Sequence, residues 1–201
     1  MADGGYSVAA LDWLAPDGAW TVEGEGVRLR PPRRGDYAEW SMLRDRSRAF
    51  LQPWEPTWPA DDLTRAAFRR RLTAYARERA EGIAYRFLVF RSQDGALTGG
   101  LSLSNVRRGV AQTATLGYWA GEPFAGRGYT TAAVRAAVRF AFGSLGLHRV
   151  EAACVPDNER SARVLLKCGF EPEGHAREYL KIDGRWRDHS LFGLVKTEEG
   201  A

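Results

Sequence analysis

Apolar residues recur along the chain with two different periods, and each period predicts one kind of element. Segments in which apolar and polar residues alternate, or in which an apolar run stands between turn residues, are typical of β-strands. Seven segments have this pattern, and we predict them as strands: residues 27–30, 84–90, 97–105, 111–119, 148–155, 170–180 and 190–195. Gln93-Asp-Gly95 and Asp183-Gly184 have the composition of tight turns, so the strands beside them should pair antiparallel.

Apolar residues that return at every third or fourth position predict helices. The expected ranges are residues 36–48, 61–75, 130–142 and 159–168. Asp36, and one of Asp61 and Asp62, stand where a side chain would cap the first turn of a helix. Gly169 follows the last helix, as a C-terminal cap often does.

The order of these elements predicts an α/β (α+β mixed) fold. One strand, two helices, three strands, a helix, a strand, a helix and two strands form a mixed sheet with helices on both faces. The chain of 201 residues suffices for one domain with a sizeable core. We expect residues 25–197 to form that single domain. Residues 1–24, rich in Gly, Ala and Asp, are expected to be a weakly ordered N-terminal lead-in.

The most informative local feature lies between residues 111–119 and the helix predicted after them. Gly121-Glu-Pro123 ends the strand, and Gly126-Arg-Gly128 leads directly into the helix. Such a turn directs main-chain N–H groups and the positive end of the helix dipole toward one point. The pattern therefore predicts a ligand that carries phosphate groups and is held by main chain. A dinucleotide fingerprint needs a third glycine, and a P-loop needs a Gly-Lys-Ser/Thr ending; the turn has neither.

Composition narrows the classes of function. With 44% hydrophobic and 27% charged residues, the chain resembles an ordinary soluble domain, and it has neither a long apolar run nor a secretory signal pattern. The net charge of +4 permits acidic partners, but basic residues are not interleaved with aromatic ones as nucleic-acid binding requires. We therefore expect no direct nucleic-acid recognition and no membrane association. The three isolated histidines predict no metal site. Cys154 and Cys168, in apolar surroundings, are expected to be buried, reduced thiols of a cytoplasmic protein.

A second block lies about 30 residues downstream of the glycine turn. It contains Asn158, Ser161 and the run Leu-x-Lys-x-Gly169-Phe170. Together with the glycine turn, this block resembles the GNAT acyl-CoA N-acetyltransferases. Further segments are similar to the RimJ/RimL branch of that family, with RimJ the closer likeness: residues 51–56, 117–119, 121–124 and 178–189. The resemblance covers residues 27–195 and departs from the family's usual turn at Ala125 and Thr130.

The resemblance implies a fold and a cosubstrate. The fold would be a GNAT-type, mostly antiparallel sheet of about six to seven strands that is splayed near its centre. The cosubstrate would be acetyl-CoA, with no metal. Pantetheine would pair with the main chain of Tyr118, Trp119 and Ala120, where one freed N–H would stabilise the oxyanion. The pyrophosphate would lie on the N–H groups of Gly126, Arg127, Gly128, Tyr129 and Thr130.

Asn158 and Ser161 take their expected roles from the same resemblance. Asn158 would orient the end of pantetheine, and Ser161 would act as the general acid that protonates the departing thiolate. The residues alone favour helix capping instead, with Ser161 facing outward, because Asn and Ser both suit helix starts. The implied mechanism is direct attack of the acceptor amine on the thioester in a ternary complex.

The resemblance also places an acidic residue, Glu178, near the acceptor amine, where it would act as the general base. A solvated strand glutamate is the alternative, and Glu122 or a chain of water molecules are the other candidates for the base. An α-amine with a pKa of about 8 costs only about 1.4 kcal/mol to deprotonate at pH 7, whereas a lysine amine near 10.4 costs about 4.6 kcal/mol. A weak base is therefore enough for an N-terminal acceptor.

The stiff aromatic segment at residues 51–59 is expected to line the acceptor side through Trp54, Glu55 and Trp58, with a packed structural loop as the alternative. The expected acceptor is the N-terminal α-amine of a protein, in particular a ribosomal protein that begins with alanine or a similar small residue. The enzyme would be a monomer or a homodimer. Two other functions stay open: acetylation of a small-molecule amine, and a non-catalytic module that binds CoA or associates with the ribosome.

Overall fold

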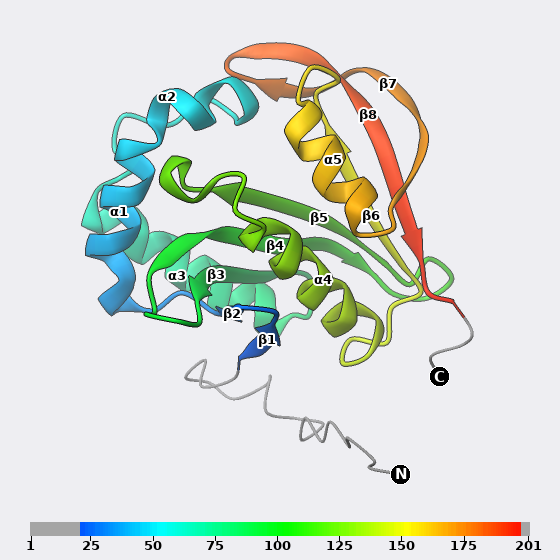
Figure 1. Cartoon of the computed structure of the whole chain (residues 1–201), viewed down its shortest axis with the longest axis horizontal. Coiled ribbons are helices and arrows are strands. Elements are labelled where there is room, and N and C mark those ends of the chain that lie inside the picture. The colour runs from blue at the N-terminus through cyan, green and yellow to red at the C-terminus, as the bar shows by residue number, and fades with distance from the viewer. Residues whose placement is uncertain (1–20, 198–201) are drawn as a thin grey trace.

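The computed structural model describes residues 21–197. These residues form one eight-stranded mixed sheet with helices against both faces (Figure 1). Residues 1–20, most of the predicted lead-in, lie outside the described residues. The last three residues of the predicted lead-in (residues 1–24), Val22–Gly24, form a strand.

The elements follow the predicted order. The strands are β1 (Val22–Gly24), β2 (Val27–Arg30), β3 (Tyr85–Arg91), β4 (Leu97–Arg107), β5 (Thr113–Ala120), β6 (Arg149–Cys154), β7 (Glu171–Ile182) and β8 (Arg185–Val195). The α-helices are α1 (Tyr37–Arg46), α2 (Arg48–Leu51), α3 (Arg65–Ala80), α4 (Tyr129–Phe142) and α5 (Glu159–Lys167). Single 3-10 turns are η2 (Arg34–Asp36), η3 (Gln52–Trp54) and η4 (Glu122–Phe124).

The strand order in the sheet is β1-β2-β3-β4-β5-β6-β8-β7. Neighbouring strands are antiparallel except for β5 and β6, which are parallel. The prediction of a mixed, mostly antiparallel sheet is confirmed. The eighth strand is β1, whose three residues are too few to show a period. β8 begins at Arg185 instead of residue 190, because four of its first five residues are polar and give a weak apolar signal.

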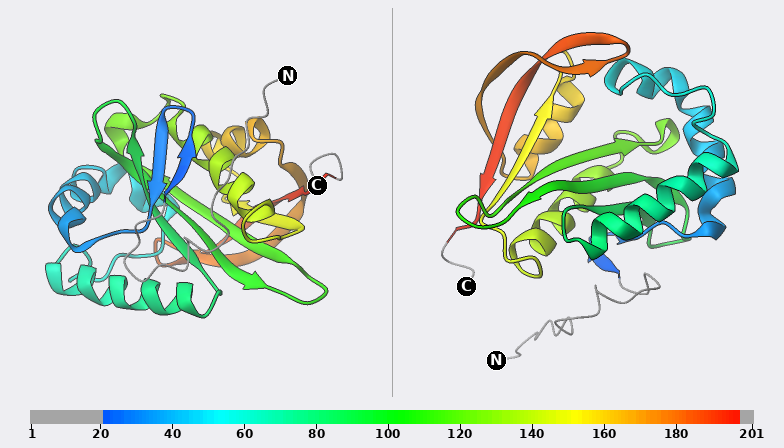
Figure 2. Two further views of the ribbon diagram at one scale, coloured as in Figure 1. Left: turned by 90° about the horizontal axis from the view of Figure 1, so that it is seen from below. Right: turned by 180° about the vertical axis from the view of Figure 1, so that it is seen from behind.

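Helices cover the two faces of the sheet at different strands. α4 packs against β1, β2, β4 and β5, and α5 lies beside it over β6. On the opposite face α3 packs against β3 and α1 against β4, as the two views of Figure 2 show. α4 buries one continuous apolar face in the main core, made of Ala133, Val134, Ala136, Ala137, Phe140 and Ala141. The long helix after the glycine turn is thus the central element of the core, and its N-terminus is fixed with it.

Two of the predicted helix caps are wrong. Asp36 precedes α1 but does not cap it; its carboxylate accepts two N–H groups of Arg30 at 2.7 and 2.8 Å, and the main-chain N–H of Arg33 in the preceding turn at 2.7 Å. The side chain of Asp62 pairs with Arg71, and α3 is capped by Thr64, whose hydroxyl accepts the N–H of Ala67 at 3.1 Å. A guanidinium offers a carboxylate a full opposite charge and, at Asp36, two N–H donors at once, so an arginine within reach takes the carboxylate.

The described part of the chain has no helix long and apolar enough to cross a bilayer. Nor do three His, Cys, Asp or Glu side chains within residues 21–197 lie close enough to share a metal ion. Cys154 is buried and Cys168 is half-buried, and both thiols are free. Burial raises the pKa of each thiol, so both stay protonated at neutral pH.

Replacement of Phe140 by alanine tests the core around α4. Phe140 is 6% exposed and makes edge contacts with the rings of Tyr85 and Phe87 at 5.7 and 5.8 Å. We expect Phe140→Ala to lower the free energy of unfolding by about 3–5 kcal/mol, measured by urea denaturation, because it leaves a cavity. Leu166→Ala on the exposed side of α5 is the control and should change it by less than about 0.5 kcal/mol. Equal effects of the two substitutions would contradict the assignment of this core.

Candidate active site

The sheet opens in its middle, where β5 and β6 part. These strands are parallel and pair only from Thr113 with Arg149 to Leu116 with Ala152. Beyond that point, residues 117–120 of β5 pair with β4 and have no partner on β6 in the described chain. Their main chain therefore has a free edge inside the sheet, to which an extended ligand can add as a strand would. The predicted splay is confirmed at the residues expected to pair with pantetheine.

The glycine turn ends at the N-terminus of α4. Gly126 and Gly128 have φ angles of 75° and 86°, in the left-handed region that glycine adopts without strain. No side chain caps α4, and the first hydrogen bond of the helix runs from the N–H of Ala132 to the carbonyl of Gly128. The N–H groups of Tyr129 and Thr130 therefore have no acceptor within the helix. A Cβ on either glycine would meet no atom within 4 Å, so the approach to these donors is open.

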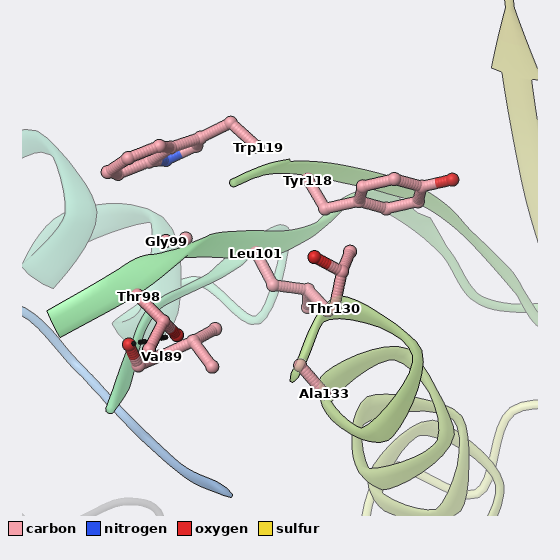
Figure 3. A pocket seen from close by; sticks show the side chains of 9 residues that line it. Val89, Thr98, Gly99, Leu101, Tyr118, Trp119, Thr130 and Ala133 are labelled. Atoms are coloured by element: carbon pink, nitrogen blue, oxygen red, sulfur yellow. Dashed lines mark hydrogen bonds between the residues drawn. The ribbon is translucent and has the colours of Figure 1, made fainter. Parts of the chain in front are cut away.

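A small pocket lies where the first turn of α4 meets β3, β4 and β5 (Figure 3). Its lining is Val89, Thr98, Gly99, Gly100, Leu101, Tyr118, Trp119, Thr130 and Ala133. Tyr118 and Thr130 lie on the α4 side of the strands, and the indole of Trp119 lies on the other side. A Cβ on Gly100 would collide with Trp119 Nε1, so the indole needs glycine beneath it. Successive residues of β5 thus serve opposite faces of the sheet.

The side chain of Tyr118 connects β5 to α5. Its hydroxyl lies within hydrogen-bond distance of two Ser161 oxygens, Oγ at 2.8 Å and the main-chain carbonyl oxygen at 3.1 Å. Burial raises the pKa of the Tyr118 hydroxyl above its usual range, so the phenol is neutral. Only a main-chain role was predicted for Tyr118 from the sequence, and this contact was missed. The two residues are 43 positions apart, and no local pattern indicates that they meet.

Asn158 caps α5, as the residue types alone favour. Its Oδ1 accepts the N–H of Ser161 at 3.1 Å, which fixes the first turn of the helix and the position of Ser161. The cap occupies the oxygen of the carboxamide, so a contact with pantetheine through the amide nitrogen is compatible with it. That contact stays a prediction. Ser161 does not simply face outward, because its hydroxyl lies against Tyr118.

Glu178 lies at a bulge in β7. The pairing of β7 with β8 shifts between Ala176 and Leu180, and Glu178 has a φ of 46°. Its N–H donates to Asp188 Oδ1 at 2.9 Å, while Asp188 Oδ2 lies 3.0 Å from His175 Nε2. These two contacts, the N–H first, lower the pKa of Asp188. The side chain of Glu178 is exposed, and its role as general base stays a prediction.

Glu55 is held in a cluster of four residues, Arg44, Glu55, Trp58 and Trp119, which we call the Glu55 clamp. Arg44 donates one N–H to each carboxylate oxygen of Glu55 at 2.7 Å, and Trp58 Nε1 donates to Oε2 at 2.7 Å. The guanidinium of Arg44 lies 4.1 Å from the ring centre of Trp58 and 5.0 Å from that of Trp119. Three donors engage the carboxylate, which supports the packed-loop alternative for Glu55 and Trp58.

The segment before the clamp also meets the tip of the β7–β8 hairpin. The side-chain amide of Gln52 donates to Asp183 Oδ1 at 3.2 Å, and the N–H of Asp183 donates to the carbonyl of Glu55 at 2.9 Å. Figure 1 shows the hairpin reaching across to the end of α2. Trp54, on η3, is partly buried in this region. The three residues predicted for the acceptor side are therefore close together, in a segment fixed to both β5 and the hairpin.

Glu122 follows β5 at the start of η4. Its N–H donates to the buried hydroxyl of Ser47 at 2.9 Å, and the N–H of Gly121 donates to the carbonyl of Thr98 at 2.8 Å. These bonds anchor the turn to the end of α1 and to β4. The side chain of Glu122 is exposed, and it remains a candidate base.

Known proteins are similar in sequence to this chain. The family model described as the acetyltransferase (GNAT) domain matches residues 27–171. The chain is 35% identical over 178 residues to the probable N-acetyltransferase YjcK of Bacillus subtilis (strain 168), covering 89% of this chain and 98% of that protein. It is 36% identical over 152 residues to the ribosomal protein uS5-alanine N-acetyltransferase of Escherichia coli (strain K12), covering 76% of this chain and 78% of that protein.

A solved structure agrees with these similarities. The RimJ protein of Mycobacterium smegmatis, in complex with CoA-disulfide, superposes with a TM-score of 0.83 at 32% sequence identity. The match covers 92% of this chain and 90% of that protein.

Replacement of Glu55 by glutamine tests the clamp. Because Arg44 is 8% exposed, Glu55→Gln leaves a buried guanidinium without its counter-charge. We expect the free energy of unfolding, followed by tryptophan fluorescence in urea, to fall by about 2–3 kcal/mol. Glu159→Gln, which breaks the exposed pair of Glu159 with Arg163, is the matched control and should cost less than about 0.5 kcal/mol. A Glu55→Gln protein as stable as the control protein would show that the clamp does not hold the loop.

Proposed function

Because the chain belongs to the acetyltransferase (GNAT) family, we propose that it transfers the acetyl group of acetyl-CoA to the N-terminal α-amine of a protein. The acceptor in this proposal is a ribosomal protein that begins with alanine or another small residue, modified in the cytoplasm. The enzyme is an N-acetyltransferase by family; the cosubstrate, the acceptor and the site residues are the proposed part. The observation that carries the proposal is the free edge of β5, which leads directly to the open N-terminus of α4.

That edge and that helix end fit the two chemical parts of the coenzyme. The amide groups of pantetheine can pair with the main chain of Tyr118, Trp119 and Ala120, as a strand would. Five successive N–H groups, those of residues 126–130, can hold the pyrophosphate, aided by the helix dipole and the Thr130 hydroxyl. Neutral main-chain donors also allow the ligand to dissociate. Its release leaves no charged side chain of the protein buried without a partner.

The chemistry needs few further groups. In the proposed mechanism the acceptor amine attacks the thioester carbonyl directly, and a freed N–H of β5 stabilises the oxyanion. Ser161, at the start of α5, gives a proton to the departing sulfur, and Asn158 orients the end of pantetheine. Glu178, Glu122 or water takes the proton of the amine. An exposed carboxylate is a sufficient base, because an α-amine is already partly neutral at pH 7.

The name of one relative supports the acceptor. The Escherichia coli protein similar to this chain acts, by its name, on the alanine of ribosomal protein uS5. The segment containing Trp54, Glu55 and Trp58 adjoins the β7–β8 hairpin, and both lie beside the splay of the sheet. In our proposal these elements guide the N-terminus of the acceptor toward the thioester.

The direct test is to incubate the protein with acetyl-CoA and a short peptide that begins with alanine. Thiol release and mass spectrometry would measure the acetylation. An N-terminally blocked peptide with an internal lysine is the control acceptor and should react at least about tenfold more slowly. Acetylation of a polyamine or an amino acid, with no reaction at the peptide, would instead indicate a small-molecule acetyltransferase. Binding of CoA with no turnover of any amine would indicate a non-catalytic module.

Substitution in the glycine turn tests the coenzyme site. At Gly128, whose φ is 86°, alanine would have to adopt a left-handed conformation. That strain costs an L-residue about 1–2 kcal/mol, and it should displace the N–H groups that follow. We expect the Kd for CoA, measured by calorimetry, to rise about tenfold in Gly128→Ala.

Gly109→Ala is the matched control for this substitution. Gly109 has a φ of 65°, and it lies in open space in the β4–β5 turn. The strain is therefore similar, but it falls away from the proposed coenzyme site, and the Kd should stay unchanged. A Gly128→Ala protein with the wild-type Kd would remove the turn from the site.

Ser161→Ala tests the general acid. We expect kcat for peptide acetylation to fall at least about tenfold while the KM for acetyl-CoA stays within about twofold, because the proton is needed only as the thiolate departs. Ser41→Ala, which removes an exposed helical hydroxyl on α1, is the matched control. A rate within about twofold of wild type would show that Ser161 is not the acid.

A further inference from the structure

The hydroxyl of Tyr118 meets both oxygens of Ser161. The Tyr118 oxygen lies 2.8 Å from Ser161 Oγ and 3.1 Å from the Ser161 carbonyl oxygen. Tyr118 comes from the part of β5 that has lost β6, and Ser161 comes from the first turn of α5. The contact therefore spans the opening of the sheet, at the place where the proposed function puts the departing sulfur.

The number of protons limits what this contact can do. A phenol has one proton, and the carbonyl of Ser161 can only accept. When Tyr118 donates to that carbonyl, the short contact between the two hydroxyls requires Ser161 to donate to Tyr118, and the serine proton is occupied. When Tyr118 donates instead to Ser161 Oγ, the serine proton becomes available to another acceptor. Rotation of the two hydroxyl hydrogens separates the two arrangements.

We propose that Tyr118 is the positioning residue for the general acid: by donating to Ser161 Oγ it directs the serine proton toward the sulfur of the coenzyme. The inference rests on the proposed function and deepens it, since only main-chain groups of Tyr118 were expected to act. It also explains why a hydroxyl-bearing ring stands on the α4 side of β5 and reaches across to α5.

Tyr118 stays neutral throughout the proposed acetyl transfer. The amine nitrogen bonds to the carbonyl carbon and loses one proton to solvent or to a base. The carbon–sulfur bond then breaks, its electron pair stays on sulfur, and the sulfur takes the Ser161 proton. Ser161 Oγ, stabilised meanwhile by the hydrogen bond from Tyr118, recovers a proton from solvent. Tyr118 keeps its own proton, in agreement with the burial that raises the pKa of its hydroxyl.

A double-mutant cycle tests the inference. We would measure kcat and KM for acetyl-CoA in wild type, Tyr118→Phe, Ser161→Ala and the double variant. We expect Tyr118→Phe to lower kcat about tenfold with the KM within about twofold, and to have no further effect when Ser161 is already alanine. Tyr37→Phe is the matched control, because it removes a half-buried tyrosine hydroxyl that donates to the carbonyl of Leu63 at 3.0 Å, and it should leave kcat unchanged.

Two results would overturn the inference. One is a Tyr118→Phe enzyme with a kcat within about twofold of wild type. The other is a cycle in which the two losses multiply, because Tyr118 would then act by packing and not through Ser161.

A second readout separates this inference from the proposed function. The same four proteins would be assayed for hydrolysis of acetyl-CoA, which breaks the same carbon–sulfur bond without an acceptor. Hydrolysis that follows the expected cycle, with no peptide acetylation, would reject the proposed acceptor and uphold the role of Tyr118. Absence of both reactions would reject both proposals.

Discussion

The parting of β5 from β6 after four paired residues is the constraint on which the rest of the structure depends. A strand in the middle of a sheet normally satisfies its main-chain groups on both sides, and an unsatisfied group inside a protein is costly. Here residues 117–120 keep β4 on one side and lose their partner on the other. The sheet tolerates this edge because helices and turns hold both strands from outside: α4 and α5 on one face, and the turn at Gly121 anchored to β4 and α1.

Successive side chains of β5 point to opposite faces of the sheet, so they contact different parts of the proposed site. Tyr118 points toward α4 and α5 and meets Ser161, while Trp119 points to the opposite face and packs beside Arg44 in the Glu55 clamp. A single strand thus contacts the group proposed to protonate the leaving sulfur and the segment proposed to receive the acceptor. The main chain between those two residues stays available for the coenzyme. Displacement of the strand would disturb all three, so a rigid core beneath α4 serves the proposed chemistry as well as stability.

Charge contributes to this site through pairing and main-chain dipoles more than through net charge. Arg44 is engaged by Glu55 and two indole rings, and the first turn of α4 offers neutral N–H groups where a phosphate is proposed to lie. Ser161 and Tyr118 are neutral hydroxyls in partly buried surroundings. The Asp188–His175 pair, by contrast, fixes the bulge at Glu178 through the main chain. Preorganised dipoles of this kind need no rearrangement when the ligand binds.

The sequence by itself determined the order of the elements, the mixed sheet, the glycine turn and the helix after it, because alternation, helical periodicity and turn chemistry act between residues close in the chain. It also determined the family, since the glycine turn and the Asn158–Ser161 block keep their residue types in the linear order. Only the tertiary structure decided that Glu55 holds Arg44, that Asp62 pairs with Arg71 in place of capping α3, that Glu178 stands at a bulge and that Tyr118 meets Ser161. These outcomes depend on which polar partner the folded chain brings within about 3 Å. That partner can be 9 residues away, as for Asp62 and Arg71, or 43, as for Tyr118 and Ser161, and the period of apolar residues specifies neither.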